Sequence, residues 1–248
     1  MCIDTERFER ARGRVIGIER QRLGIGTLSE KTVHAVLKNY YAPDEDMHEI
    51  PIENFVADIF DGEAVIEIQT RSFQNMRRKL AALPLYPVTI VYPIPHVKWL
   101  HWMDEETGEI SPGRKSPKKG NAYQAFIELY KIRPFLKDPN LRLRLDLIDM
   151  EEYRLLNGWS RDKKKGSDRF DRIPLTFVEE VRVDRREDYM QFIPYEIPEE
   201  FTAKDFAACA KIPVRLAQTV LLILTDLLIV ERIGKQGRSY LYRICEIE

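Results

Sequence analysis

The amino-acid sequence predicts an α/β protein, of the α+β type, followed by a small separate domain. The first observation is the order of hydrophobic patterns over about residues 15–95, which reads helix, three strands, helix, strand. The second is a hairpin signal, Asp61-Gly62, between two of those strands. The third is a change of pattern near residue 195, after which two helices precede two strands.

The individual elements follow from hydrophobic spacing and from turn residues. Val33, Val36, Leu37 and Tyr40 recur at helical spacing and predict a helix from Thr27 to about Tyr40. The other expected elements are strands over 47–52, 55–60 and 64–70, a helix over 73–83, a strand over 88–92, a hairpin over 97–111, a helix over 121–133, a strand over 141–150, a charged loop over 157–172, and one strand with a connector within 173–195.

Residues 195–248 are expected to form their own domain, separate from residues 1–190. Thr202 and Asp205 form a capping-box pattern at a helix start, and Pro213 suits the first turn of a second helix. The remaining features are strands over 228–233 and 240–244 with a basic, glycine-bounded turn over 234–239. This order of elements is typical of the end of a winged helix-turn-helix.

Composition narrows the class of protein. The chain has 248 residues, of which 44% are hydrophobic, and a net charge of -1, which argues against disorder and against nucleic-acid binding by bulk charge. Its three cysteines are far apart and odd in number, as in reduced cytosolic proteins. No signal-peptide pattern begins the sequence, and the most apolar run, 216–230, is too short for a bilayer. We therefore expect a cytoplasmic protein without a membrane partner.

The neutral sum conceals a segregation of charge. From Tyr40 to Glu67 there are nine acidic residues and no Lys or Arg. Basic residues gather in loops, as Arg114, Lys115, Lys118 and Lys119 and as Lys163, Lys164 and Lys165. One basic loop by itself is more simply a solvated surface. Several of them beside an acid-only segment fit a metal centre surrounded by phosphate-binding charges.

The candidate site lies in residues 55–70, where the turn decides how two acids face each other. With Asp61-Gly62 as the turn, Asp58 is the diagonal neighbour of Glu67. With Gly62-Glu63 as the turn, Asp58 lies directly opposite Glu67. The sequence leaves both registers open.

Either register leaves Asp58, Glu67 and Gln69 on one face, because side chains alternate along a strand. Two carboxylates placed close together among apolar neighbours lose solvation and repel each other. A divalent cation removes both costs, and hard oxygen ligands suit Mg²⁺. The alternative is a strand whose acids lie near its end in water.

This pattern resembles the PD-(D/E)XK, or restriction-endonuclease-like, nuclease superfamily in a Glu-x-Gln variant. The resemblance is carried by Glu30 on the first helix, Asp58, and Glu67-Ile68-Gln69, in the expected α-β-β-β-α-β order. It implies Mg²⁺ or Mn²⁺ held by Asp58, Glu67 and the carbonyl of Ile68. It gives Glu30 a role in supporting the attacking water or a second metal. The implied activity is metal-dependent hydrolysis of phosphodiesters in DNA by an endonuclease.

Gln69 departs from the family pattern, because it stands where a lysine is usual and an amide carries no charge. Arg71 or Lys79 could supply the missing charge, and the sequence does not choose between them. Glu30 also fits a helix-capping role. His34, one turn later, could reach the site, although a position on the helix surface is the simpler interpretation.

The expected partner is duplex DNA. Candidate contacts are Arg71, Arg114, Lys115, Lys118, Lys119, Lys163, Lys164, Lys165, Arg215, Gln218, Lys235 and Arg238. The leading hypothesis is an endonuclease that a winged helix docks on DNA, and it admits a homodimer. The alternatives are a catalytically inactive nuclease-fold protein that binds DNA or regulates, and a scaffold whose winged helix binds protein.

Overall fold

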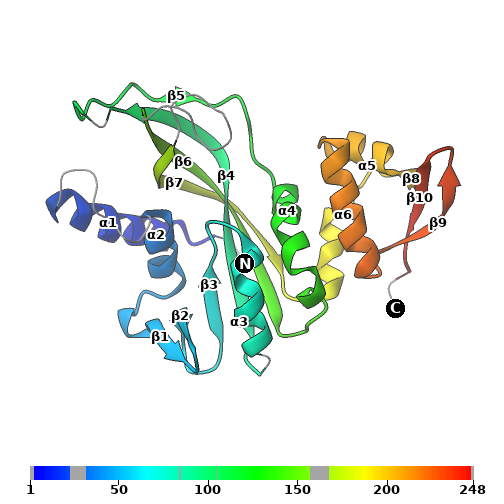
Figure 1. Ribbon diagram of the computed structural model, residues 1–248, viewed down its shortest axis with the longest axis horizontal. Helices are drawn as coiled ribbons and strands as arrows, with labels where there is room; N and C mark the ends of the chain where they lie inside the picture. The colour runs from blue at the N-terminus through cyan, green and yellow to red at the C-terminus, as the bar shows by residue number, and fades with distance from the viewer. Residues whose placement is uncertain (1–2, 23–31, 84, 105, 157–167, 247–248) are drawn as a thin grey trace.

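The computed structural model describes residues 3–22, 32–83, 85–104, 106–156 and 168–246, and it has the predicted α/β class (Figure 1). A mixed sheet of seven strands forms its centre, in the order β1-β2-β3-β4-β6-β7, with β5 paired to β4. Its strands are β1 His48–Ile52, β2 Phe55–Phe60, β3 Val65–Ile68, β4 Val88–Met103, β5 Arg114–Lys115, β6 Leu141–Leu155 and β7 Asp168–Val183.

Strand directions divide the sheet into three parts. The first three strands form antiparallel hairpins, β3 runs parallel to β4, and β4 runs parallel to β6. The edge strand β7 returns antiparallel to β6. The long strands β4, β6 and β7 run side by side and curve strongly (Figure 1).

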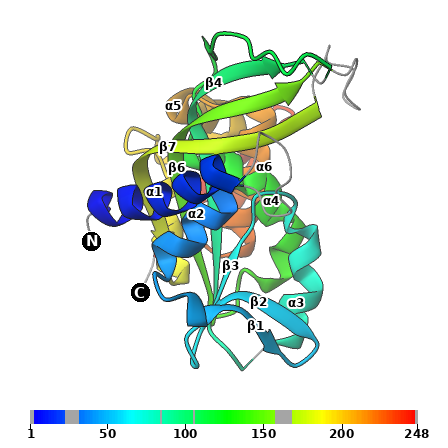
Figure 2. The same ribbon diagram turned by 90° about the vertical axis from the view of Figure 1, so that its left-hand side faces the viewer.

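Helices cover both faces of the sheet. Helices α1 (Thr5–Arg22) and α2 (Thr32–Tyr41) lie on one face, in front of the sheet in Figure 2, and share a core with Ile59, Ile68 and Ile148. Helices α3 (Met76–Ala82) and α4 (Phe126–Leu129) lie on the other face. Short 3₁₀ helices occupy Glu45–Met47, Phe73–Asn75, Ala122–Ala125, Tyr130–Phe135 and Arg186–Phe192.

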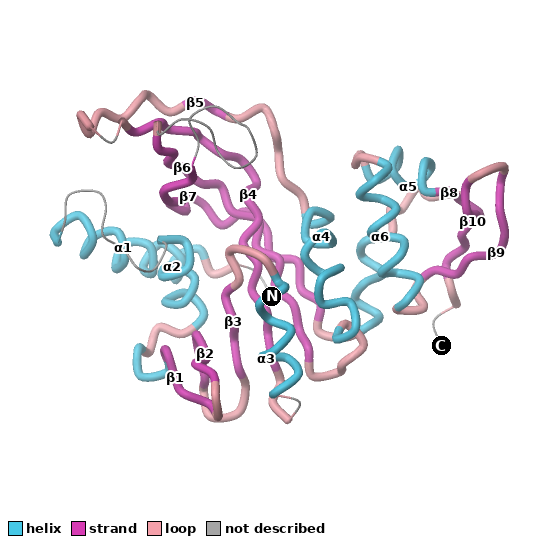
Figure 3. The backbone as a smooth tube through the Cα atoms, in the orientation of Figure 1, coloured by secondary structure: helices cyan, strands magenta, loops and turns pink. Residues whose placement is uncertain are grey.

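The C-terminal elements form a second, smaller sheet with two helices, at the opposite end of the molecule from α1 (Figure 3). These elements are β8 Glu200–Thr202, α5 Ala203–Ala210, α6 Val214–Asp226, β9 Val230–Gln236 and β10 Ser239–Ile244. The predicted capping box is confirmed, because the Thr202 hydroxyl accepts from the Asp205 N–H while the Asp205 carboxylate accepts from the Thr202 N–H.

Helix α6 packs against α4, and the buried side chains of both belong to one hydrophobic core. An ion pair of 2.6 Å between Arg133 and Asp226 bridges the same contact. Among the described helices, none alone is both long and apolar enough to cross a bilayer. Helices α5 and α6 reach that length only as a pair, and a bend of 108° separates them.

Several predicted boundaries need correction. Helix α1 was not expected, and of the predicted helix from Thr27 the part over 27–31 lies outside the described residues. Strands β4 and β6 run well beyond 88–92 and 141–150, although the turn near Gly108 forms as expected. The charged loop predicted over 157–172 is wrong for 168–172, which open β7. These charged residues form a strand because they pair with β6 in register.

Helix α2 is tied to the sheet at both of its ends. At its N-terminus, Thr32 donates from its backbone N–H (3.3 Å) and from its hydroxyl to the carboxylate of Asp171 on β7. At its C-terminus, the Tyr41 hydroxyl lies 3.0 Å from Asp146 and 2.9 Å from Glu180. These polar contacts fix the axial position of the helix and therefore of His34 between them.

Phe126→Ala is expected to lower the free energy of unfolding by about 3–5 kcal/mol, because it removes buried apolar contacts and leaves a cavity in the core. The Phe126 ring is fully buried and lies 4.9 Å from that of Phe192. Urea denaturation of this variant beside Ile127→Ala, whose side chain is 54% exposed, is the measurement. Equal losses in the two variants would contradict the core assigned here.

Candidate functional site

The β2–β3 hairpin brings the two predicted acids face to face. Ile59 pairs with Ile66, and continuing this register sets Asp58 directly opposite Glu67. The turn is therefore Gly62-Glu63, the second of the two registers left open by the sequence.

The predicted register with Asp61-Gly62 as the turn is wrong, because Asp61 lies before the two-residue loop and its side chain caps that loop. Its carboxylate accepts from the N–H groups of Glu63 and Ala64, at 2.9 and 2.8 Å. Gly62 takes a φ of 97°, a conformation that a glycine adopts without strain. Asp61 thus caps the turn that Gly62 makes, and this combination selects the register.

Each carboxylate of the pair is fixed by the backbone of the strand opposite. The Asp58 N–H donates to Oε1 of Glu67 at 3.3 Å, and the Ile68 N–H donates to Oδ2 of Asp58 at 2.7 Å. Glu67 is only 2% exposed. The predicted alternative, two acids at a strand end in water, is therefore wrong for Glu67.

One basic side chain from each covering helix reaches the pair. From α2, Nε2 of His34 lies 3.2 Å from Oδ2 of Asp58. From α3, Nζ of Lys79 lies 2.7 Å from Oε1 of Glu67 and donates to the carbonyl of Val56 at 2.7 Å. The surface position favoured for His34 is therefore wrong. Between Lys79 and Arg71, it is Lys79 that contacts the acids.

The pKa values of the two acids shift in opposite directions. Burial, and then the charge of Asp58, raises the pKa of Glu67 to about 7, although Lys79 opposes this shift. Burial by itself raises the pKa of Asp58, but His34, the Ile68 N–H and Lys79 outweigh it and leave this pKa lowered. The pair therefore carries one firmly ionised carboxylate and one that exchanges its proton near neutral pH.

Gln69 does not join the pair. Its side-chain amide donates to the sulfur of Met76 on α3 at 3.2 Å, while its backbone N–H donates to Val91 at 2.8 Å. Glu30 lies outside the described residues, as do Lys163, Lys164 and Lys165. The other DNA-contact candidates are exposed, namely Arg71, Arg114, Lys115, Lys118, Lys119, Arg215, Gln218, Lys235 and Arg238.

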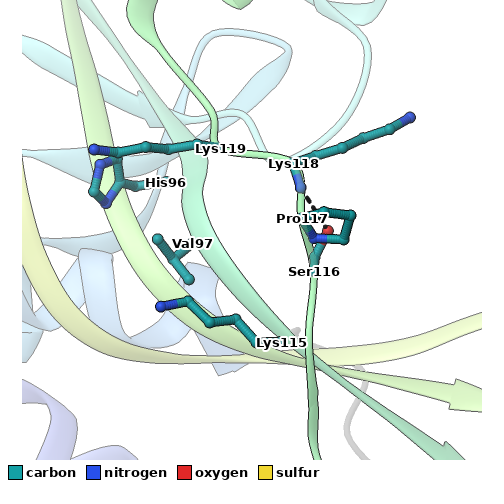
Figure 4. Close-up of a pocket in the computed structure, with 7 residues that line it drawn as sticks. All are labelled: His96, Val97, Lys115, Ser116, Pro117, Lys118 and Lys119. Carbon is teal, nitrogen blue, oxygen red and sulfur yellow. Dashed lines mark hydrogen bonds between the residues drawn. The ribbon is translucent and has the colours of Figure 1, made fainter.

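Lysines of one predicted basic loop border a pocket of about 440 Å³ beside β4 (Figure 4). The side chains of Lys115 and Lys119 extend toward the side where His96 lies, whereas that of Lys118 extends away. Nδ1 of His96 lies 2.7 Å from Asp149. The pocket shares none of its residues with the Asp58–Glu67 pair.

The carboxylate pair has part of the character of a metal site. Among the described residues, no group of three or more His, Cys, Asp or Glu side chains is placed to hold a metal ion. Burial, and then the charge of Asp58, nevertheless raises the pKa of Glu67, so the ionised form of Glu67 needs more stabilisation than Lys79 provides. A divalent cation between Asp58 and Glu67 would meet that need, with further ligands from the Ile68 carbonyl and from water.

Residues 31–184 match the model of a protein family described as a domain of unknown function, DUF8091, and the chain belongs to this family. An uncharacterized protein of Treponema pallidum (strain Nichols) is 25% identical over 191 residues, which cover 74% of this chain and 73% of that protein. No solved structure matches the chain. The family match includes Asp58 and Glu67 and ends at the close of β7, before the C-terminal elements begin.

In the presence of EDTA, the free energy of unfolding is expected to fall as pH rises from about 4.5 to about 7. Over that range the folded protein keeps a proton on Glu67 that the unfolded chain has lost, so the folded state binds more protons and loses stability with rising pH.

Glu67→Gln should reduce this fall, since the amide oxygen still accepts from Asp58 and Lys79 but does not ionise. Urea denaturation at several pH values measures the pH dependence of the free energy of unfolding, with Glu63→Gln, at an exposed residue, as the control. Parallel curves for wild type and Glu67→Gln would show that Glu67 titrates normally.

Proposed function

We propose that the chain is a divalent-metal-dependent endonuclease of the restriction-endonuclease-like class, acting on DNA with the Asp58–Glu67 pair as its reaction centre. The observation that carries this proposal is the direct apposition of a buried carboxylate, Glu67, and a partly buried one, Asp58, across one hairpin. Its further support is the order of elements around the hairpin, in which α2 precedes three strands and α3 and β4 follow them.

Each residue of the centre has a defined task in this proposal. Asp58 and Glu67 would hold Mg²⁺ or Mn²⁺ with the carbonyl of Ile68, and His34 would keep Asp58 oriented through its 3.2 Å contact. The bound cation would lower the pKa of the attacking water and stabilise negative charge that develops on the phosphate.

Lys79 supplies the positive charge that Gln69 lacks. Its ammonium group lies against Glu67, whereas the amide of Gln69 points to Met76. If Glu67 held a divalent cation in place of Lys79, the Lys79 ammonium would be available to contact a phosphate oxygen. A lysine on the helix after the hairpin then serves where the family pattern places one on the strand.

Residues 195–248 would form a winged helix-turn-helix that docks the enzyme on duplex DNA. The proposal rests on the order of β8, α5, α6, β9 and β10 and on the exposure of Arg215 and Gln218 along α6. At the β9–β10 turn, Lys235 and Arg238 are exposed as well. These positions suit contacts to the phosphate backbone, which fix register on a duplex.

A second candidate is a nuclease-fold protein that binds DNA without cutting it. The observation that favours it is the Lys79–Glu67 ion pair, which already places a cation at the carboxylate pair. The two candidates differ in whether a divalent cation displaces this lysine.

Supercoiled plasmid and short duplexes are expected to be cleaved in Mg²⁺ or Mn²⁺ but not in EDTA. Asp58→Asn and Glu67→Gln should each lower the rate by about 100-fold or more, because each removes a ligand charge from the cation that stabilises the reacting phosphate. Glu63→Gln, in the same hairpin, should cleave at the wild-type rate. Cleavage that is absent in wild type, or unchanged in both acid variants, would exclude the enzyme.

Lys79→Gln should slow cleavage by about 10-fold or more, because it removes the positive charge that would stabilise the reacting phosphate. Gln69→Ala should leave the rate nearly unchanged, since its amide contacts Met76. Arg78→Gln, an exposed neighbour of Lys79 on α3, is the matched control. Single-turnover rates separate the chemical step from DNA binding. Loss of activity in Gln69→Ala but not in Lys79→Gln would show that Gln69, and not Lys79, contacts the reacting phosphate.

A further inference from the structure

A group of cationic side chains surrounds one buried acid on the long strands of the sheet. Glu152 on β6 is fully buried. Its carboxylate accepts hydrogen bonds from Nζ of Lys98 at 3.3 Å, Nε of Arg154 at 2.8 Å and Nε of Arg172 at 2.9 Å. In register, Glu152 lies between Leu100 of β4 and Arg172 of β7. Three adjacent strands therefore contribute to one group.

Two further arginines lie near this group. Arg169 on β7 stands opposite Arg154 in register. Arg169 is exposed at the surface, and partial desolvation, followed by the nearby charges of Arg172 and Arg71, lowers the pKa of Arg169. Arg71 follows Glu67 by four residues, so the group begins just beyond the strand that carries Glu67. We call Lys98, Arg154, Arg172, Arg169 and Arg71 the Glu152 cationic cluster.

The cluster carries more positive charge than its acid neutralises. Within the part of the chain that the structure describes, Glu152 forms ion pairs with three of these cations, and no carboxylate forms an ion pair with Arg169 or Arg71. One negative charge against the three cations that pair with it leaves an excess of two, to which the exposed Arg169 and Arg71 add. The side chains of Lys98, Arg154 and Arg172 are between 17% and 23% exposed, so water screens their repulsion only in part.

A purely structural role would not need this excess. A buried carboxylate is satisfied by one or two cations, and each additional partly buried cation adds a desolvation cost and a repulsion. Burial lowers the pKa of Lys98, and Arg172 adds to the shift in spite of Glu152. The arrangement is thus set for an anion that is not part of the chain.

We propose that the Glu152 cationic cluster binds backbone phosphates of the duplex DNA that reaches the Asp58–Glu67 pair. Guanidinium groups bind phosphate oxygens through paired hydrogen bonds, and the cluster offers four of them with one ammonium group. Glu152 engages Nε of both Arg154 and Arg172 and thereby holds these side chains in one orientation. This inference rests on the proposed function, because it assigns a binding surface to the same substrate.

The test is duplex binding without cleavage, measured in EDTA by fluorescence anisotropy of a labelled duplex at several salt concentrations. Arg169→Gln should raise the Kd about 10-fold and reduce the slope of log K against log salt by about one, as expected for the loss of one phosphate contact. Arg172→Gln should act in the same direction. Arg142→Gln, an exposed arginine at the start of β6, should leave both quantities unchanged.

Arg169 makes no ion pair with Glu152, so its variant is expected to fold, and thermal denaturation of every variant checks this. Unchanged Kd and salt slope in folded Arg169→Gln and Arg172→Gln overturn the inference even if the wild type cleaves DNA. Wild-type protein that binds no duplex also overturns it. Weaker binding in both variants supports it, and if the wild type then fails to cleave in Mg²⁺ or Mn²⁺, the proposed activity alone is overturned.

Discussion

The apposition of Asp58 and Glu67 across the β2–β3 hairpin is the constraint on which the account of this protein depends. The register that opposes them follows from a turn in which Asp61 caps the loop and Gly62 takes a positive φ. Once opposed, the buried Glu67 and the partly buried Asp58 require positive charge. His34 from one face of the sheet and Lys79 from the other meet part of that requirement, and they join both helical layers to the hairpin.

Farther along the long strands of the sheet, the balance of charge is reversed. There one buried acid, Glu152, lies among several cations, whereas the hairpin concentrates acids. The net charge of -1 thus conceals two local imbalances of opposite sign. Under the proposed function, the hairpin would hold a divalent cation and the Glu152 cationic cluster would bind phosphates of the substrate.

Much of the hairpin could be predicted from the sequence, because alternation along β2 and β3 and the residues of the turn are local signals. The capping box of α5 is local as well. The lengths of β6 and β7 were missed, since their outer halves are rich in charged residues and are stabilised by pairing with neighbours. Glu152 and its cations were missed for the same reason, as the register of three strands brings them together. His34 and Lys79 depend on where α2 and α3 dock.

The most direct measurement is anomalous X-ray scattering from crystals soaked in Mn²⁺. The account predicts a peak between the carboxylate oxygens of Asp58 and Glu67, with Nζ of Lys79 moved away from Oε1 of Glu67. The peak should disappear in Asp58→Asn. Mn²⁺ bound elsewhere, or a hairpin that keeps the Lys79–Glu67 ion pair and holds no metal, would contradict the central claim.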